Sequence, residues 1–269
     1  TDLTGVQPWA LPISVDHYGP LFEAQELMKK SNVPHVLIFR LSNRPNNGPQ
    51  YDTPNYAATP EAAADAHWAM TLAGLPPEFD KARVWLEVIN EVDRNLCWWL
   101  GRFALRIMDL AERDDYKVSF FGWAGGEPEP QGWEAPEMLL ALRRIAASPA
   151  RFAVAIHEYS FLVSDIWDQA PYKVGRFQYL FAVCDKFGFP RPTVHITEWG
   201  LTLDDVPPFD VALVDMTAVG QLYAQHPQIQ GAAIWYLGDG FGGIANKAQQ
   251  LIKPVTDWTL SHQDRKSVV

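Results

Sequence analysis

Two glutamates in this chain each close an apolar stretch that reads as a buried strand. Glu91 follows Asn90 at the end of RVWLEVINE, and Glu198 lies in the sequence Thr-Glu-Trp-Gly. A carboxylic acid can give a proton to a departing oxygen, and a carboxylate can attack or stabilise an electron-poor carbon. Two carboxyl groups in unlike environments can divide these roles between them. Glu91 and Glu198 are therefore the candidate catalytic pair.

Other predicted strands also end in polar or aromatic residues. His157 and Tyr159 alternate with Glu158. Because side chains alternate between the two faces of a strand, His157 and Tyr159 share one face and Glu158 starts on the other. Trp235 lies near the end of the last apolar strand. Four strand ends would thus direct polar or aromatic groups toward one mouth.

The elements that must position these residues alternate between apolar strands and amphipathic helices. Strands are predicted at residues 11–15, 34–41, 83–91, 117–123, 152–159, 193–198 and 231–237. Helices are predicted at residues 20–30, 60–73, 96–110, 136–147, 174–184 and 209–224. This alternation is typical of a parallel sheet covered by helices on its outside. The sequence therefore predicts an α/β fold, a (β/α)₈ barrel of the TIM type.

The strand count is one short of a complete barrel. An eighth strand has to fit within the first ten residues, so the first β/α unit is expected to be degenerate or incomplete. A doubly wound open sheet is the alternative, and it is disfavoured because no Gly-rich phosphate loop follows any early strand. The chain shows no internal repeat, low-complexity tract or linker, which predicts a single catalytic domain over residues 1–269.

The longest connections all follow strands. They are residues 42–58, 124–135, 201–208 and 238–246. In a barrel, loops that follow strands lie on the carboxyl face, where active sites are built.

Taken in order, these motifs resemble clan A of the glycoside hydrolases, the retaining enzymes on (β/α)₈ barrels that include families 5 and 39. The matched pieces are Asn90-Glu91 after the fourth strand, His157-x-Tyr159 after the sixth, Glu198 after the seventh and Trp235 on the eighth. The resemblance spans about residues 83–237. It implies a glycosidase that cleaves β-linked glycans with retention of configuration, by a two-glutamate double displacement.

The resemblance also implies a role for each matched residue. Glu91 would be the acid/base and Glu198 the nucleophile, and retention asks for carboxyl groups about 5–5.5 Å apart. Asn90 would donate to the sugar 2-hydroxyl, and Trp235 would form the floor of the sugar subsite. Arg40, at the end of the third strand, departs from the clan, which more often places a functional Arg on an earlier strand.

The two glutamates need different surroundings. Glu91 has to be protonated at working pH, which apolar walls such as Trp123 and a nearby second carboxylate would favour. Glu198 has to stay ionised, so Tyr159 or Arg40 is expected to donate to it. The predicted substrate-binding residues are Asn90, His157, Tyr159, Trp235, Arg40 and Trp123.

Other ionisable residues have structural interpretations. Glu87 shares the strand parity of Glu91, so it is expected to point inward or to pair with a base deeper down. His195 has the opposite parity to Glu198, which directs it to the helical layer as a core histidine. His157-Glu158 lies on a strand and lacks the second His of a helical zinc motif, so neither a metal nor another cofactor is predicted.

Composition limits the partners. A net charge of −10 with a pI near 5.1 argues against nucleic acid and anionic membranes, since both attract clustered Lys and Arg. Eleven Trp and nine Tyr offer faces for stacking on sugars, so an oligo- or polysaccharide is the expected partner of a monomeric protein. No apolar run reaches the ~18 residues of a membrane span. The chain opens with Thr1 and no signal-peptide pattern, so a secreted protein whose leader was removed stays one of the options for its compartment.

Two other functional interpretations remain open at the level of sequence. One is a carbohydrate-binding barrel that keeps the cleft without turnover. The other is a barrel enzyme that uses its carboxylates with a metal ion. The aromatic loops favour an open cleft for a polymer over a closed pocket for one sugar, and they do not identify the sugar or the linkage.

Overall fold

The computed structural model describes residues 11–30, 35–43, 48–162, 164–200, 207–235, 246, 248–254 and 257. The strands are β1 Leu11–Val15, β2 His35–Arg40, β3 Val84–Glu87, β4 Lys117–Trp123, β5 Phe152–Tyr159, β6 Val194–Gly200 and β7 Ile229–Ile234. The helices are α1 Tyr18–Lys30, α2 Pro60–Gly74, the 3₁₀ turn η1 Arg94–Leu96, α3 Cys97–Asp114, α4 Pro130–Trp133, α5 Pro136–Ala147, α6 Phe177–Lys186 and α7 Phe209–Ala224.

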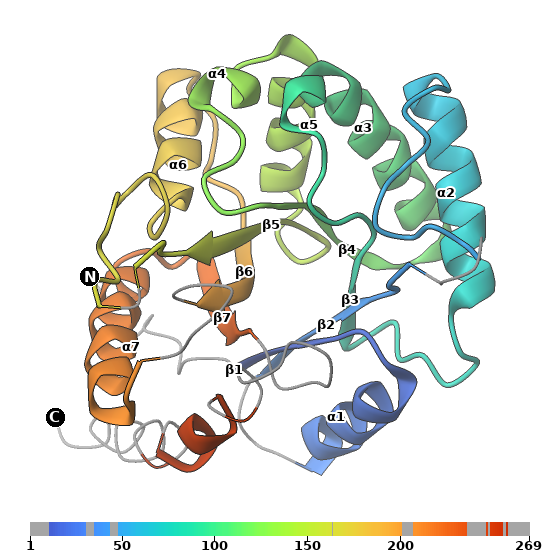
Figure 1. Cartoon of the computed structure of the whole chain (residues 1–269). Helices are drawn as coiled ribbons and strands as arrows, with labels where there is room; N and C mark the ends of the chain where they lie inside the picture. Colours follow the sequence, from blue (N-terminus) through green and yellow to red (C-terminus); the bar gives the residue numbers. More distant parts are fainter. Residues whose placement is uncertain are drawn as a thin grey trace, which may run out of the picture.

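The seven described strands form one parallel sheet in sequence order, from β1 to β7. The two outer strands, β1 and β7, lie close together, so the sheet curls into a nearly closed barrel. Figure 1 shows the strands at the centre with the helices around them. The predicted α/β fold of the TIM-barrel type is confirmed. A doubly wound sheet does not fit, because the strand order of such a sheet reverses at a switch point, whereas the strands here follow one another in sequence order. The predicted eighth strand falls in residues 1–10, outside the described residues.

Apolar side chains form two separate layers, one on each side of the strands. The larger cluster packs helices against the outer faces of the strands and includes Leu37, Phe39 and Leu86. The smaller cluster joins Ile38, Trp85 and Ala153, with Val36 packed against it. Alternating residues of β2 and β3 thus face the helices and the barrel axis in turn, as strand geometry requires.

A helix cap and a close approach of two backbones shape the helical layer. The side chain of Thr59 caps α2 by accepting a hydrogen bond from the backbone N–H of Ala62. Pro60, which has no backbone N–H, begins the helix at a position where an N–H would have no partner within the helix. Gly101 of α3 meets the start of α5, where an added Cβ would lie 2.4 Å from the carbonyl carbon of Glu137. Only a glycine allows α3 and α5 to approach this closely.

Two strands end earlier than the sequence predicts. β3 stops at Glu87, and β7 runs from Ile229 to Ile234, which leaves Trp235 just beyond its end. After β3, the backbone N–H of Asn90 donates to the carbonyl of Asp52 at 2.7 Å, and Glu91 adopts a left-handed φ of 44°. A left-handed residue cannot continue a strand, so the prediction of an extended stretch through residue 91 was wrong. Within the described ranges, no helix is both long and apolar enough to cross a bilayer.

Candidate active site

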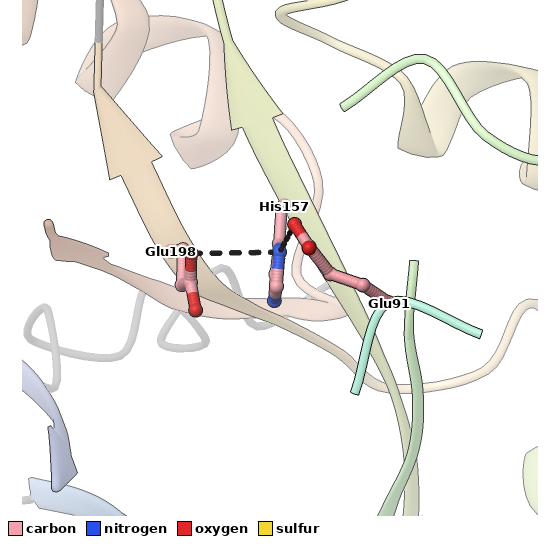
Figure 2. Close-up of side chains that lie close together, drawn as sticks. All are labelled: Glu91, His157 and Glu198. Atoms are coloured by element: carbon pink, nitrogen blue, oxygen red, sulfur yellow. Dashed lines mark hydrogen bonds and ion pairs between the residues drawn. The ribbon is translucent and has the colours of Figure 1, made fainter. Parts of the chain in front are cut away.

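The carboxyl ends of several strands bring the two candidate glutamates to one place. Glu198 lies on β6, and Glu91 reaches across from the loop after β3. Figure 2 shows both carboxylates beside His157 of β5. One carboxylate oxygen of Glu91 lies within 4.8 Å of one oxygen of Glu198. Pairs of carboxyl groups that work with retention stand about 5–5.5 Å apart, and inverting pairs about 6.5–9.5 Å apart, so this separation matches the retaining class.

Glu198 is held by a donor on each of its oxygens. The hydroxyl of Tyr159 donates to Oε2 at 2.7 Å, and Nη2 of Arg40 donates to Oε1 at 2.9 Å. Both donors that the sequence predicted for this carboxylate are confirmed. Burial and the adjacent charge of Glu198 raise the pKa of Tyr159, so the phenol stays a donor. The pair of hydrogen bonds fixes the direction of the carboxylate.

Arg40 links the nucleophile candidate to Asn90. While Nη2 binds Glu198, Nη1 donates to Oδ1 of Asn90 at 2.6 Å. The amide nitrogen of Asn90, which can only donate, makes no hydrogen bond within the described part of the chain. Burial acts to lower the pKa of Arg40, but the charges of Glu87 and Glu198 outweigh it and raise that pKa. Arg40 therefore works as a permanent cation that also orients the Asn90 amide.

Glu91 stands in more open surroundings than Glu198. Its side chain is 54% exposed, and Oε1 lies 3.4 Å from Nδ1 of His157. Its backbone N–H donates to the carbonyl of Gly122 at 2.8 Å. The hydrogen bond from His157 is the main reason that the pKa of Glu91 lies below its usual value, and burial opposes it only in part. The predicted apolar setting that would raise this pKa is therefore wrong.

Trp123 does not form the expected wall beside Glu91. Its side chain is fully buried and stacks on Phe121 with ring centroids 5.2 Å apart. Both rings belong to the apolar cluster that joins strands to helices. A ring with no exposed face cannot stack on a ligand, so the predicted substrate contact of Trp123 is contradicted.

His157 lies between the two carboxylates (Figure 2). It is fully buried, with Nδ1 3.6 Å from Glu198 and 3.4 Å from Glu91, and with Nε2 3.9 Å from Glu87. Burial acts to lower the pKa of His157, but the charges of Glu198, Glu87 and Glu91 outweigh it and raise that pKa to about 9. The predicted direct contact of His157 with substrate is thus corrected to a contact with the carboxylates.

Trp235 extends the site on the side of Glu198. Its ring stands edge to face with Tyr159, at a centroid distance of 6.1 Å, and is half-buried. Its backbone N–H donates to the carbonyl of Trp199 at 2.9 Å, which fixes the chain just after β7. The ring therefore lies next to the tyrosine that binds the nucleophile candidate.

A buried carboxylate lies below the site. Glu87 is 2% exposed, and its Oε1 accepts from the hydroxyl of Thr197 at 2.9 Å. Its Oε2 lies 3.8 Å from Nη1 of Arg40. Glu87 was expected to point inward or to pair with a base deeper down; it points inward and lies near the Arg40 cation. Sequence parity gave no sign of Thr197 as its partner.

Gly122 is a second residue of the site, besides Thr197, that the sequence did not single out. Its φ is +50°, and an added Cβ would lie 2.8 Å from Oε1 of Glu87 and 3.0 Å from Oδ1 of Asn90. A glycine in the middle of an apolar strand is the only local signal of this close approach.

His195 faces the barrel axis, and its predicted place in the helical layer is wrong. Its Nδ1 lies 2.7 Å from the hydroxyl of Ser119, and its ring meets Trp85 edge to face at 4.8 Å. The cause is a register shift: Ile156 pairs with Ile196, and the next residue of β5 already pairs with Glu198. Burial lowers the pKa of His195 to about 4, so it is a neutral core histidine, as expected.

The arrangement does not favour a metal ion. Glu91, His157 and Glu198 each offer one ligand atom within 4.8 Å of the others. Both ring nitrogens of His157 face carboxylates, however, and its pKa near 9 keeps both protonated at neutral pH. A metal ion at Nδ1 would first have to displace that proton. We therefore do not assign these residues as metal ligands.

Comparison with known proteins adds little at the level of sequence. No protein-family model and no curated protein matches this chain. Among solved structures, the chain is similar to XacCel5A, with 17% sequence identity and a TM-score of 0.46. The match covers 84% of this chain and 74% of that chain. A likeness at this level supports no statement about activity, which has to be argued from the side chains themselves.

Proposed function

We propose that this protein is a retaining glycoside hydrolase that cleaves β-linked glycans through a covalent glycosyl-enzyme. The observation that carries the proposal is the separation of the two carboxylates, within 4.8 Å, at the carboxyl ends of barrel strands. The donors on Glu198 and the exposure of Glu91 place the two carboxyl groups in unlike settings.

In the first step, an oxygen of Glu198 attacks the anomeric carbon of the sugar. The bond from that carbon to the leaving oxygen breaks, and Glu91 passes its proton to the leaving oxygen. Before the attack, Tyr159 and Arg40 aim the nucleophile, so little reorganisation is needed as the new bond forms.

In the second step, the ionised Glu91 takes a proton from a water molecule while the water oxygen attacks the same carbon. The ester bond to Glu198 breaks, and the carboxylate returns with its electron pair to the donors Tyr159 and Arg40. Two inversions at one carbon leave the original configuration. Glu91 ends the cycle protonated, as it began.

Two further residues would bind the sugar. The amide nitrogen of Asn90 is oriented by Arg40 and serves as the donor to the 2-hydroxyl. Trp235 lies beside Tyr159 and provides the apolar floor under the sugar ring. Substrate binding is thus assigned to Asn90 and Trp235, while Arg40, Tyr159 and His157 act on the carboxylates.

A product-resolved screen tests the proposal. Purified protein is incubated with β-glucans, mannans, xylans and peptidoglycan, and released reducing sugars are separated and identified. We expect release from at least one glycan, and a loss on the order of 10³-fold or more in Glu91→Gln and in Glu198→Gln, since a single lost stabilising group already costs 10²–10³. Full activity of both Gln variants would show that the assignment is wrong.

One observation favours a second candidate, a carbohydrate-binding barrel without turnover. The contact with His157 holds the pKa of Glu91 low, which leaves little of the protonated acid at neutral pH. This candidate predicts glycan binding by isothermal titration calorimetry with no sugar release at any pH from 3 to 8. Release at acid pH decides in favour of the hydrolase.

A further inference from the structure

Three carboxylates and two cations share the base of this site. Glu87 is the deepest of them, and its side chain is fully buried. Its carboxylate lies 3.8 Å from the guanidinium of Arg40 and 3.9 Å from the imidazole of His157. A buried carboxylate is unfavourable unless cations or donors compensate it, and here two cations do so together.

Each of those cations also contacts at least one member of the catalytic pair. Arg40 binds Glu198 with one nitrogen and Asn90 with another. His157 presents Nε2 to Glu87 and Nδ1 to both Glu91 and Glu198. Through Arg40 and His157, Glu87 is therefore linked to Glu91, Glu198 and Asn90. These are the residues that the proposed function places at the reacting bond or on the sugar, apart from Trp235.

The charge on the histidine follows from this geometry. A neutral imidazole carries one N–H and one lone pair. Since carboxylates face both nitrogens of His157, a neutral ring would point its lone pair at one of them. The doubly protonated ring presents an N–H on each side: Nδ1 lies 3.4 Å from Glu91 and 3.6 Å from Glu198, and Nε2 lies 3.9 Å from Glu87.

The chain also keeps the space around Glu87 clear. Gly122 leaves no Cβ where one would collide with Glu87 and Asn90, and Thr197 donates to the same Glu87 oxygen. Both features fit a carboxylate at this position and fix where it lies.

We propose that Glu87 is a positioning residue for the catalytic pair: it anchors the guanidinium of Arg40 and the doubly protonated ring of His157 in the places from which they contact Glu198, Asn90 and Glu91. Its effect on turnover rests on the proposed glycosidase function. Its effect on His157 does not.

The groups that face this network come from several strands around it. They are Arg40 of β2, Asp52 after β2, Glu91 after β3, Tyr159 of β5, and His195 and Glu198 of β6. His195 is neutral, and Tyr159 is a protonated phenol. Removal of the Glu87 charge therefore leaves His157 with Glu91 and Glu198 as its remaining counter-charges.

The test is Glu87→Gln, which keeps the shape and the acceptor for Thr197 but removes the charge. Histidine-selective ¹H–¹⁵N spectra at pH 7 should show both ring nitrogens of His157 protonated in the parent protein. In the variant, we expect the ring to lose one proton at a pH at least one unit lower. On a substrate found by the screen, kcat should fall on the order of tenfold or more with little change in KM, because a charge-assisted contact is lost.

Glu158→Gln is the matched control. Glu158 is equally buried on the same strand as His157, but its carboxylate accepts from the backbone of Gly175 and the hydroxyl of Tyr223. This variant removes an equally buried carboxylate away from the site. Its His157 spectrum and pH profile should match the parent.

The outcomes separate the two proposals. If Glu87→Gln leaves the His157 spectrum and kcat as in the parent, Glu87 is not a positioning residue. If no glycan is cleaved by the parent protein, the proposed function fails while the His157 spectrum still decides the role of Glu87. If Glu87→Gln does not fold, Glu87→Asp carries the test, because it keeps the charge but withdraws the carboxylate. A parental kcat and unshifted His157 signals in Glu87→Asp would overturn the proposal.

Discussion

Glu198 and Glu91 carry the same functional group, yet they meet different partners. Glu198 receives a phenol and a guanidinium, one on each oxygen. Among the described residues, the Glu91 carboxylate meets the imidazole of His157 at 3.4 Å, and its side chain is half exposed. A fixed carboxylate suits attack on carbon, and an exposed one suits proton exchange with a leaving group or water.

The low pKa of Glu91 gives a pH prediction with a definite sign. His157 holds this pKa below its usual value of 4.5. A general acid works in its protonated form, so a lower pKa moves the alkaline limb of kcat/KM to lower pH. We expect the kcat/KM of the parent protein to fall as the pH rises through the acid range, as measured in a pH–rate profile on a cleaved glycan.

His157→Asn checks the cause of this pH dependence. The substitution removes the cation beside Glu91, so the pKa of Glu91 should rise and the alkaline limb should move to higher pH. An alkaline limb above pH 7 in the parent, or no shift in the variant, would contradict the assignment of Glu91 as the acid.

Tyr159→Phe tests the clamp on the nucleophile. The variant loses the 2.7 Å hydrogen bond to Oε2 of Glu198. We expect kcat to fall on the order of 10- to 100-fold, the effect of one hydrogen bond to a charged group. Tyr172→Phe is the control, because its hydroxyl binds Glu129 on the surface at 3.1 Å. Equal kinetic effects of the two substitutions would rule out a specific role for Tyr159.

At the level of elements, the strands were predictable, but the ends of some of them were not. Long apolar runs placed β4 and β5 at the bounds that the structure shows. The turn at Glu91 depends instead on partners distant in sequence, the carbonyls of Asp52 and Gly122. The side toward which β6 directs His195 depends on a register shift between neighbouring strands. Neither the turn nor the register shift leaves a periodic pattern in the sequence of its strand. Strand parity alone therefore placed His195 on the wrong face.

The left-handed backbone conformation of Gly122, near the end of β4, yields a stability prediction. Gly122→Ala places a Cβ 2.8 Å from Glu87 in a residue with φ of +50°. Gly188→Ala is the matched control, since Gly188 has φ of +67° and nothing within 4 Å of an added Cβ. The control should lose about 1–2 kcal/mol of unfolding free energy from the left-handed conformation alone. Gly122→Ala should lose more, as measured by urea unfolding. Equal losses would mean that the contacts around Gly122 adapt without cost.

For the whole molecule, the alternation of strands and helices was enough to predict a parallel barrel, because each connection returns the chain to the same end of the sheet. That topology gathers strand ends, so Glu91 and Glu198 were predictable as neighbours although the chain separates them widely. The charge state of the site was not predictable. It depends on three carboxylates and two cations that different strands bring together, and only their distances show that carboxylates face both ring nitrogens of His157.

The separation of Glu91 and Glu198, within 4.8 Å, makes the stereochemistry of the first product the most direct test of the central claim. ¹H NMR can follow the anomeric signals during the first minutes of hydrolysis of a β-linked glycan, before mutarotation mixes them. The account predicts that the β-anomer appears first and the α-anomer grows in later. The α-anomer appearing first would show inversion and would contradict a double displacement through Glu198.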